Sequence, residues 1–519
     1  MAKLPSVMRH DFSKVPVAEI PRSSFDRSHG HKTTIDAGKL YPIFVDEALP
    51  GDTFNLSMTV FGRLATPLHP FMDNLFMDVH YFAVPIRLIW DNWQKFNGEQ
   101  DNPADSTDFV VPTTSAGVGG YAAETLHDYF GIPVGIDGLT HMALAHRAYN
   151  LIWNEWYRDQ NLQDSVTVNK DDGPDPTGDY VILSRGKRHD YFTSCLPWPQ
   201  KGPAVALPLG TEAPVLGIGY DTTPAVVSQT FRETGGTSRV ANTDFGSQHI
   251  EEDPNNLGYP YIRADLSAAT AATINSLRQA FQIQKLYERD ARGGTRYTEI
   301  IRSHFGVISP DARLQRPEYL GGGTTPINIS PVVQTSETGT SPQGNLAAIG
   351  TIGATNQGFS KSFTEHCILI GLISVRADLT YQQGLNRMWS RSTRWDYYWP
   401  ALAHIGEQAV LNKEIYAQGT ADDDNVFGYQ ERFAEYRYKP SIITGRMRSS
   451  FATSLDTWHL SQDFASLPTL SSSFIEEDPP IDRVIAVATE PHFLIDSYFR
   501  VTCARPMPMY SVPGLIDHF

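Results

Sequence analysis

The sequence predicts a mainly β fold, an eight-stranded antiparallel jelly-roll barrel with large helix- and loop-containing insertions between the strands. Segments with the two-residue alternation of strands lie near both ends of the chain, and helical patterns lie between them. The 40 glycines and 35 prolines among 519 residues indicate many turns and long loops. A jelly roll fits this distribution because its Greek keys pair strands that are distant in sequence.

Five segments are predicted to be strands. Apolar residues alternate with polar residues over 54–60, 75–83 and 493–503, as expected for strands with one buried face. Residues 367–375 are nearly all apolar, which is typical of a strand buried on both faces. Residues 481–489 are predicted to form another strand.

Three helices are predicted within the insertions, each from an apolar stripe that follows a helix-starting residue. Pro85 suits the first turn of one helix, and Gly98 suits its end. Thr140 is predicted to cap the second helix, and Asp265 or Ser267 the third. Tryptophans in such stripes are expected to pack in a core rather than to hold a cofactor. The residues expected to face inward are, helix by helix, Ile86, Ile89, Trp90 and Trp93; Met142, Ala145, Tyr149, Ile152, Trp153 and Trp156; and Ile274, Leu277 and Phe281.

The composition favours a large core and gives no sign of export or membrane insertion. Hydrophobic residues make up 41% of the chain and charged residues only 19%, below the roughly 25% of typical soluble domains. None of the cysteines (Cys195, Cys367, Cys503) belongs to a CxxC pair, so neither a zinc site nor a disulfide framework is expected. The first residues lack the apolar core of a signal peptide, and no run of about 18 apolar residues predicts a membrane span. A reducing cytoplasm is therefore the expected compartment of folding.

Two stretches rich in small residues separate the regular patterns. From about 203 to 262 the chain is rich in Gly, Thr, Pro, Ala and Val. A loop of this length is usually either functional or disordered. Residues 321–358 are rich in Gly, Thr and Ser, and they are predicted to be extended or irregular.

Residues 293–323, with the sequence GGTRYTEIIRSHFGVISPDARLQRPEYLGGG, combine arginines with aromatic rings. Guanidinium groups stack on rings and bridge carboxylates in defined geometry, so this block is predicted to be structural and interfacial. It contains no catalytic motif. The glycines at 321–323 lack the lysine and the following helix that a phosphate-binding loop requires.

This block closely resembles the major capsid proteins of the gokushoviruses, small single-stranded DNA phages of the Microviridae. Residues 21–54, 66–93 and 376–409 resemble the same family, whereas about 203–262 show no comparable resemblance. The resemblance therefore covers both ends and the middle of the chain.

The resemblance implies a single viral jelly-roll capsid domain over residues 1–519, with the insertion at approximately 203–262 forming a protrusion at the threefold axes. It implies a T=1 icosahedral shell of 60 copies around a circular single-stranded DNA genome. The expected location is the virion, after assembly in the cytoplasm of the host bacterium. The expected partners are further copies of the chain, the genome, a small basic DNA-binding protein, an internal scaffolding protein, a DNA pilot protein, and a host surface receptor met by the insertion.

Charge is distributed unevenly along the chain. The net charge of −16 argues against the whole surface binding nucleic acid. Residues 1–40 hold seven Lys or Arg against four Asp or Glu, a net +3, whereas residues 203–260 hold two against seven, a net −5. A shell with its genome inside is expected to sort charge in this way, so the N-terminal segment is predicted to face the interior.

The predicted site residues are contact residues, and none is predicted to be catalytic, cofactor-binding or metal-binding. Interleaved arginines and rings over 388–399 suit either the stacking of bases or a protein hot spot, and subunit contact is favoured. The DNA-facing candidates are Arg9, Lys14, Arg446 and Arg448. The subunit-interface candidates are Arg296, Arg302, Arg313, Arg316, Trp389, Arg394 and Trp395.

Two weak metal candidates and the common catalytic motifs are set aside. His29 and His31 have no acidic or cysteine partner nearby in sequence. The acidic run at 422–424 lacks the spacing of a calcium loop, so a solvated acidic turn is expected. No GxSxG, HExxH or P-loop motif occurs, and no enzyme activity or cofactor is expected.

Two other classes of protein remain open from the sequence. A secreted carbohydrate-binding or hydrolytic β-sandwich would need a signal peptide and paired catalytic carboxylates, and neither is evident. A phage receptor-binding or spike protein usually trimerises and lacks helices between its barrel strands.

Overall fold

The computed structural model describes residues 21–202, 274–313 and 315–510, together with six short strands between 215 and 264. The chain divides into two compact units. The barrel unit comprises residues 1–199 and 293–519, and the insertion unit comprises residues 200–292. The predicted DNA-facing residues Arg9 and Lys14 lie outside the described residues.

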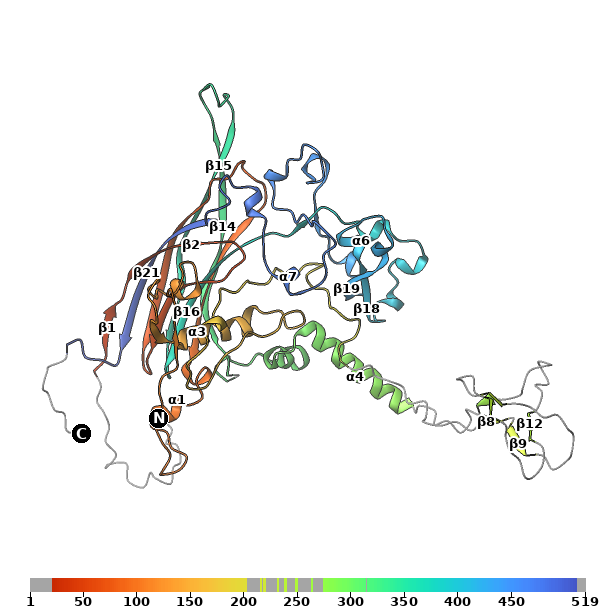
Figure 1. Ribbon diagram of the computed structural model, residues 1–519, viewed down its shortest axis with the longest axis horizontal. Helices are drawn as coiled ribbons and strands as arrows, with labels where there is room; N and C mark the ends of the chain where they lie inside the picture. Colours follow the sequence, from red (N-terminus) through yellow and green to blue (C-terminus); the bar gives the residue numbers. More distant parts are fainter. Residues whose placement is uncertain are drawn as a thin grey trace. The chain divides into compact units, whose positions relative to one another are not determined.

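The barrel unit is built on one curled antiparallel sheet of nine strands (Figure 1). Its hydrogen-bonded order is β1-β21-β4-β15-β14-β5-β16-β3, and β2 also pairs with β21. The mainly β jelly-roll prediction is confirmed, with nine strands because β1 and β2 both pair with β21. The strands are β1 (Ser23–Asp26), β2 (His29–Ile35), β3 (Tyr41–Ala48), β4 (Thr53–Leu64), β5 (Leu75–Pro85), β14 (Glu318–Val333), β15 (Leu346–Ser362), β16 (Cys367–Ala377) and β21 (Phe493–Arg505).

Burial confirms the predicted strand patterns at 54–60, 367–375 and 493–503. Over 75–83 the prediction of one buried face is wrong, because Asp78 and Phe82 on the other face of β5 are buried as well. Buried and exposed side chains alternate along β4 and β21, which present one face to the core. Every residue of β16 is buried. One face of β16, with Leu369 and Ile373, belongs to the core inside the curled sheet, and the other face, with Ile368 and Ile370, packs in a second core. This double burial explains why its sequence is continuously apolar.

Side chains connect the two edges of the curled sheet. The ring of His29 on β2 stacks on Phe499 of β21 and Phe44 of β3, with ring centroids 5.3 and 6.0 Å away. Beside it, Arg27 forms an ion pair with Asp46 of β3. His29 therefore packs at the seam between strands.

The insertions carry short elements that cover the outer face of the sheet or form a separate lobe. The second core joins this face to α3, through residues such as Leu144 and Ile152. The elements before the insertion unit are η2 (Ile86–Leu88), α1 (Trp93–Phe96), β6 (Thr113–Ser115), α2 (Leu126–Tyr129), β7 (Thr140–Met142), α3 (Leu144–Ile152), the π-helix η3 (Trp153–Tyr157) and η4 (Thr177–Asp179). Those after it are α5 (Tyr297–Ile300), η5 (Ile301–Phe305), β17 (Thr380–Tyr381), η6 (Arg387–Trp389), η7 (Arg394–Asp396), η8 (Pro400–Leu402), β18 (Glu407–Leu411), α6 (Asn412–Ile415), η9 (Ala421–Asp424), β19 (Val426–Glu431), η10 (Ala434–Tyr436), β20 (Ser441–Ile442), η11 (Gly445–Met447), η12 (Asp456–Trp458), α7 (Ser472–Ile475) and η13 (Ile481–Arg483).

Three predictions of local structure are wrong. Residues 481–489 form the short helix η13 and turns instead of a strand, because their apolar run is a short core contact and apolar runs do not distinguish these states. The predicted helix after Pro85 is broken into η2 and α1, although its stop at Gly98 is confirmed by a positive φ of 98°. Thr140 begins strand β7 instead of capping α3, because it pairs with Ser115 of β6.

The described residues of the insertion unit form three nested antiparallel strand pairs and one long helix. The pairs are β8 (Val215–Leu216) with β13 (Arg263–Ala264), β9 (Ile218–Tyr220) with β12 (Gln248–Ile250), and β10 (Phe231–Arg232) with β11 (Ser238–Arg239). The helix α4 (Ile274–Gly293) confirms the third predicted helix. Its Phe281 is 64% exposed, so the prediction that this ring faces inward is wrong. The proposed caps Asp265 and Ser267 lie outside the described residues.

The Gly-rich stretch at 321–358 is extended, as predicted. It lies in β14, in β15 and in the turn at 334–345 that joins them, and the paired ends of these strands run past the other strands (Figure 1). Gly322 has a φ of 149°, and a Cβ atom there would lie 1.9 Å from the carbonyl oxygen of Val79 on β5. Only glycine allows this close approach of two strands, so the glycine run serves the fold.

A buried carboxylate, Asp78 on β5, ties the sheet to an insertion. It accepts hydrogen bonds from Arg185 (2.6 Å), Arg376 (2.8 Å) and Thr324 (2.6 Å). Burial opposes ionisation of Asp78, but the Thr324 hydroxyl and the two guanidinium groups outweigh it and hold the pKa of this carboxyl below its ordinary value.

The depressed pKa of Asp78 predicts a contribution to acid sensitivity. The stabilisation is fully present above the ordinary pKa of an aspartate and is lost as pH falls through the lower, folded pKa. The free energy of unfolding of the wild type should therefore decline more steeply below about pH 4 than that of Asp78→Asn. Urea titrations at successive pH values measure both slopes. The exposed Asp496, paired with Lys32, supplies the control Asp496→Asn, and equal slopes for the wild type and Asp78→Asn would contradict the prediction.

Candidate assembly surfaces

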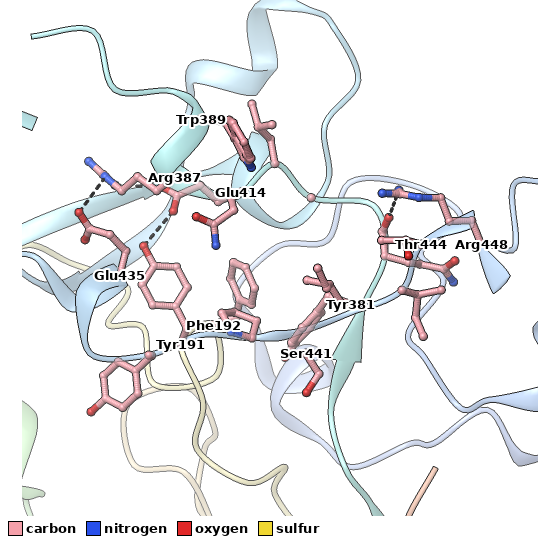
Figure 2. A pocket seen from close by; sticks show the side chains of 18 residues that line it. Tyr191, Phe192, Tyr381, Arg387, Trp389, Glu414, Glu435, Ser441, Thr444 and Arg448 are labelled. Atoms are coloured by element: carbon pink, nitrogen blue, oxygen red, sulfur yellow. Dashed lines mark hydrogen bonds and ion pairs between the residues drawn. The ribbon is translucent and has the colours of Figure 1, made fainter. Parts of the chain in front are cut away.

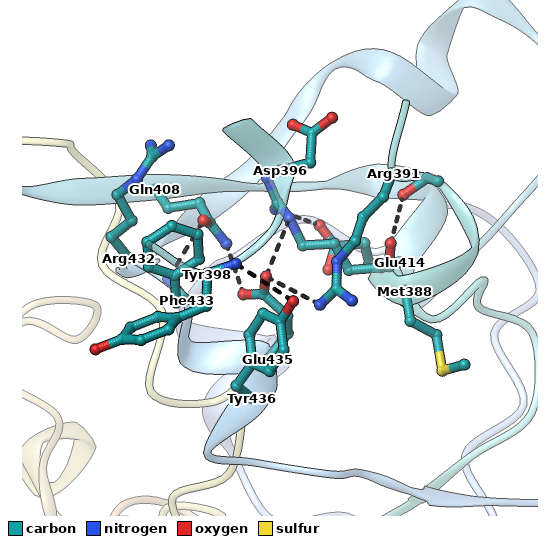
Figure 3. A network of polar contacts seen from close by, with 12 residues as sticks. Met388, Arg391, Asp396, Tyr398, Gln408, Glu414, Arg432, Phe433, Glu435 and Tyr436 are labelled. Carbon is teal, nitrogen blue, oxygen red and sulfur yellow. Dashed lines mark hydrogen bonds and ion pairs between the residues drawn. The ribbon is translucent and has the colours of Figure 1, made fainter. Parts of the chain in front are cut away.

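A buried ion network lies beside the strands β18 and β19 (Figure 3). Arg387 donates to Glu414 at 2.9 Å and to the carbonyl oxygen of Ala409 at 2.6 Å. Arg391 lies 3.5 Å from Glu435, which also accepts a hydrogen bond from Gln408. The side chains of Glu414 and Glu435 are only 2% and 5% exposed, so their charges require these partners.

Burial and the ion network act in opposite directions on Glu414. Burial raises the pKa of Glu414, whereas Arg387 and the hydrogen bonds from Leu411 and Tyr191 lower it, and burial prevails. The Tyr191 hydroxyl donates to Glu414 at 2.8 Å, and burial raises the pKa of this tyrosine. The tyrosine therefore stays a neutral hydrogen-bond donor, and the network keeps a fixed geometry.

An exposed aromatic surface lies on the chain segment that this network anchors. We define the aromatic surface as Met388, Trp389, Trp395, Tyr397, Tyr398 and Trp399. Trp389 and Trp395 are 71% and 53% exposed. The guanidinium of Arg394 lies 4.4 Å from the ring centre of Trp395 and 5.3 Å from that of Trp399. Asp396 accepts hydrogen bonds from the backbone of Ser392 and Thr393, which fixes the turn that carries these rings.

The predicted interface residues Trp389, Arg394 and Trp395 thus lie on a rigid and exposed surface. Large apolar rings exposed in this manner mark sites of contact with other macromolecules. Aromatic residues held in one conformation lose little entropy on binding, which is why tryptophan, tyrosine and arginine dominate protein hot spots. The arrangement suits protein contact.

A cavity of about 310 Å³ lies beside the ion network (Figure 2). Its wall includes Tyr191, Arg387 and Glu414 from the network side, and Trp389 from the aromatic surface. Arg448 lies on the opposite wall and donates to the carbonyl oxygen of Gln382 at 2.5 Å. The remaining lining residues are Phe192, Tyr381, Gln382, Gly384, Leu385, Asn386, Glu435, Tyr438, Pro440, Ser441, Ile442, Ile443 and Thr444.

The predicted DNA-facing pair lies on the turn around η11. Arg446 is exposed and donates to the hydroxyl of Thr453 at 2.6 Å, and Arg448 is exposed beside the cavity. Each guanidinium keeps donors for a further acceptor, because an arginine carries five N–H groups.

The arginines of residues 293–323 divide into two kinds. Arg296 is half-buried, and it donates to Glu299 and to the backbone oxygens of Asn154 and Arg158. Arg316 lies 4.2 Å from the ring centre of Trp156. These two arginines fix the block onto the end of α3 and η3, so the structural part of the prediction fits their contacts.

The other two predicted arginines of this block, Arg302 and Arg313, are exposed. They accompany exposed apolar side chains: Phe305 is 75% exposed, Val307 54% and Ile308 79%. An exposed apolar strip flanked by arginines is a second surface suited to contact between proteins. The structure does not bring all four arginines to one face.

Sequence reasoning missed the buried ion network. Arg387 lies within a stretch that was singled out, but its partners Glu414 and Glu435 come from later elements with no motif in common. The only local signal is a charged residue beside an apolar run, as at Glu414 before Ile415, and many surface residues share this pattern.

The weaker candidates of the sequence have structural roles. Asp423 accepts hydrogen bonds from the backbone of Gln418 and Gly419, and Asp424 pairs with Lys413, as expected of an acidic turn. All three cysteines are buried, and none of them forms a disulfide. In the described part of the chain, no helix is long and apolar enough to cross a membrane.

A jelly-roll sheet that displays rigid, aromatic and arginine-rich surfaces defines a protein that acts through contacts with other macromolecules, as shell-forming proteins do. A family model described as "Capsid protein (F protein)" matches residues 13–515. The chain therefore belongs to this capsid protein family and is a major capsid protein of the gokushovirus type, a component of the virion.

The relatives share nearly their whole length with the chain. The capsid protein VP1 of Bdellovibrio phage phiMH2K is 51% identical, with 98% of both chains covered. The capsid protein VP1 of Chlamydia phage 1 is 46% identical, with 99% of both covered. That of Spiroplasma virus 4 is 38% identical, covering 98% of this chain and 97% of its own. These matches decide against the spike protein and the secreted β-sandwich that the sequence left open.

Proposed function

We propose that 60 copies of the chain close into a T=1 icosahedral shell around a circular single-stranded DNA genome. The observation that carries this proposal is the rigid aromatic surface on the barrel unit, where Trp389 and Trp395 are held out to solvent. In a closed symmetric assembly, one such surface is used by every copy. Many modest contacts then add up to a stable shell through multivalency.

The mechanism is assembly without catalysis. The exposed strip around Phe305 and Ile308 provides a second contact surface, so each copy has at least two regions suited to neighbours. The insertion unit, with its acidic stretch at 203–260, is the part we assign to the outside of the shell. We place this insertion at the threefold axes, where it meets the receptor on the host surface.

The net negative charge of the chain bears on which partners the genome requires. A chain with a net charge of −16 cannot neutralise a genome by itself, because phosphate groups require lysine and arginine opposite them. A small basic DNA-binding protein therefore accompanies the genome. An internal scaffolding protein and a DNA pilot protein take part, and assembly takes place in the host cytoplasm.

The N-terminal segment and the η11 turn are the parts we assign to the genome side. Residues 1–40 carry a net charge of +3 and include Arg9 and Lys14, and the turn offers Arg446 and Arg448. Cations on the inner surface lower the free energy of the packaged phosphates.

Limited proteolysis of intact shells tests this polarity. Residues 1–30 should resist cleavage in intact, DNA-filled particles and become cleavable once the particles are disrupted. Cleavage within 200–292 should occur in intact particles. Peptide mass spectrometry locates the cuts, and the disassembled chain is the control. Rapid cleavage within 1–30 of intact shells would overturn the assignment.

A further inference from the structure

Three histidines from neighbouring elements meet beside the second core. His127 lies on α2, His141 on β7 and His146 on α3. Each ring offers a nitrogen atom, and these atoms all lie within 4.8 Å of one another. His127 and His146 are buried, and His141 is half-buried. The cluster lies wholly within the barrel unit, and none of its three residues belongs to either candidate assembly surface.

Five of the six ring nitrogens in this cluster are buried without a hydrogen-bond partner. They are both nitrogens of His127, both of His146, and Nε2 of His141. A buried polar group without a partner costs about 1–3 kcal/mol, so native proteins rarely leave such groups together. Each neutral ring carries one lone pair, so a single species that accepts three lone pairs, one from each ring, would partner three of these five nitrogens.

The spacing of the rings fits one metal ion. In a tetrahedral site with metal–nitrogen bonds of about 2.0–2.1 Å, ligating nitrogens lie about 3.3 Å apart and their ring centres about 5 Å apart. The ring centroids are 4.5 Å (His127 to His146), 5.0 Å (His141 to His146) and 5.4 Å (His127 to His141) apart. The nitrogens lie within 4.8 Å of one another, so the rings must turn toward a common point to bind one ion.

The sixth nitrogen, Nδ1 of His141, has the contact that a ligand histidine requires. It lies 3.0 Å from the carbonyl oxygen of Met142. Donation to this oxygen fixes the tautomer and leaves the lone pair on Nε2, which is the arrangement seen in metal-binding histidines.

Aromatic packing alone does not account for the cluster. Tyr121 stacks on His127 with centroids 4.0 Å apart, and Phe130 lies 4.7 Å from His146. Such contacts explain why rings are tolerated here. Phenylalanine rings could make the same contacts, and these contacts leave the histidine nitrogens without hydrogen-bond partners.

We propose that His127, His141 and His146 bind a divalent transition-metal ion of the zinc type. Three neutral imidazoles suit zinc, cobalt or nickel, and water completes the fourth position. The ion joins α2 of four residues and β7 of three residues to α3, elements too short to be stable alone. Its role is structural, because it holds α2, β7 and α3 together against the outer face of the barrel.

Metal binding to the purified full-length chain tests the site. The chain is stripped with a chelator, then titrated with Zn²⁺ or Co²⁺ and analysed by elemental mass spectrometry. We expect about one ion per chain and the visible absorption bands of tetrahedral Co²⁺. His141→Gln and His146→Gln should bind more than about 100-fold more weakly, since even outer-shell partners of ligands contribute about 10- to 100-fold. His404→Gln, at an exposed histidine outside the cluster, should bind like the wild type.

A second measurement keeps the test valid if a glutamine variant folds poorly. Zn²⁺ added to the stripped wild type should raise its melting temperature, because a ligand that binds only the folded state stabilises it. The variants should show no such rise. A wild type that binds no ion would overturn the proposal. A His404→Gln control whose metal affinity falls as much as that of the cluster variants would overturn it too.

Discussion

Replacing Asp175 with alanine should lower the free energy of unfolding by about 3–5 kcal/mol. Its partner Arg147, on α3, has a side chain that is 0% exposed and that donates to both carboxylate oxygens of Asp175, at 2.5 and 2.7 Å. The same guanidinium donates to the carbonyl oxygens of Ile89 and Asp171, so it cannot turn to solvent. Loss of this carboxylate leaves the buried guanidinium with only the exposed Asp171 as a charged partner.

The chain contains a matched control on the same arginine. Asp171 also pairs with Arg147, at 3.4 Å, but its side chain is 81% exposed. Asp171→Ala should therefore cost less than about 1 kcal/mol. Urea unfolding of the two variants and the wild type, followed by tryptophan fluorescence, compares them directly. Equal losses for both variants would show that burial of the pair does not determine its contribution.

The double variant Trp389→Ala, Trp395→Ala should fold but fail to form closed shells. Both rings are mostly exposed, so their removal should change the free energy of unfolding by about 0.5 kcal/mol or less. At an interface, each ring of this type contributes about 2 kcal/mol or more, and the loss recurs in every copy of a symmetric shell. Size-exclusion chromatography of the assembled products should show free chains or small oligomers in place of particles.

Conservative variants separate the aromatic surface from the rest of the lobe. Trp389→Phe with Trp395→Phe keeps ring area on the surface, so part of the particle yield should return. Glu435→Gln removes a charge from the buried network behind the surface, and assembly should weaken because the arginines lose their fixed positions. Normal particle yield from the alanine double variant would exclude this surface from the shell contacts.

The β framework could be predicted from the sequence because the order of polar and apolar residues within a strand reflects which of its faces are buried. Alternation over 54–60 and 493–503 follows from one buried face, and the unbroken apolar run of β16 follows from burial on two. Local patterns failed where tertiary contacts decide the state. Thr140 has the chemistry of a helix cap, yet pairing with β6 places it in a strand.

The exposed aromatic segment was singled out by residue type, and its supporting structure was not predicted. Trp389, Arg394 and Trp395 lie in one short segment with a typical hot-spot composition. What makes them rigid is a network whose carboxylates come from α6 and η10, beyond the reach of any local pattern. The histidine cluster has the same property, since His127 lies 14 residues before His141 and only the fold brings their rings together.

The arginines of the block at 293–323 lie in two different environments. Arg296 and Arg316 are used inside the subunit, against η3 and Trp156. Arg302 and Arg313 stay exposed beside an apolar strip. The composition alone did not separate these roles, because stacking inside a subunit and stacking across an interface use the same chemistry.

The mass of the assembled particle tests the proposed shell most directly. The wild-type chain, expressed with its scaffolding protein, should yield closed particles whose protein shell is 60 copies of a 57.8 kDa chain, about 3.5 MDa. Native mass spectrometry gives the mass, and electron microscopy of the same sample should show shells a few tens of nanometres across. Soluble monomers or trimers only, or a shell mass that corresponds to a different number of copies, would contradict the T=1 shell.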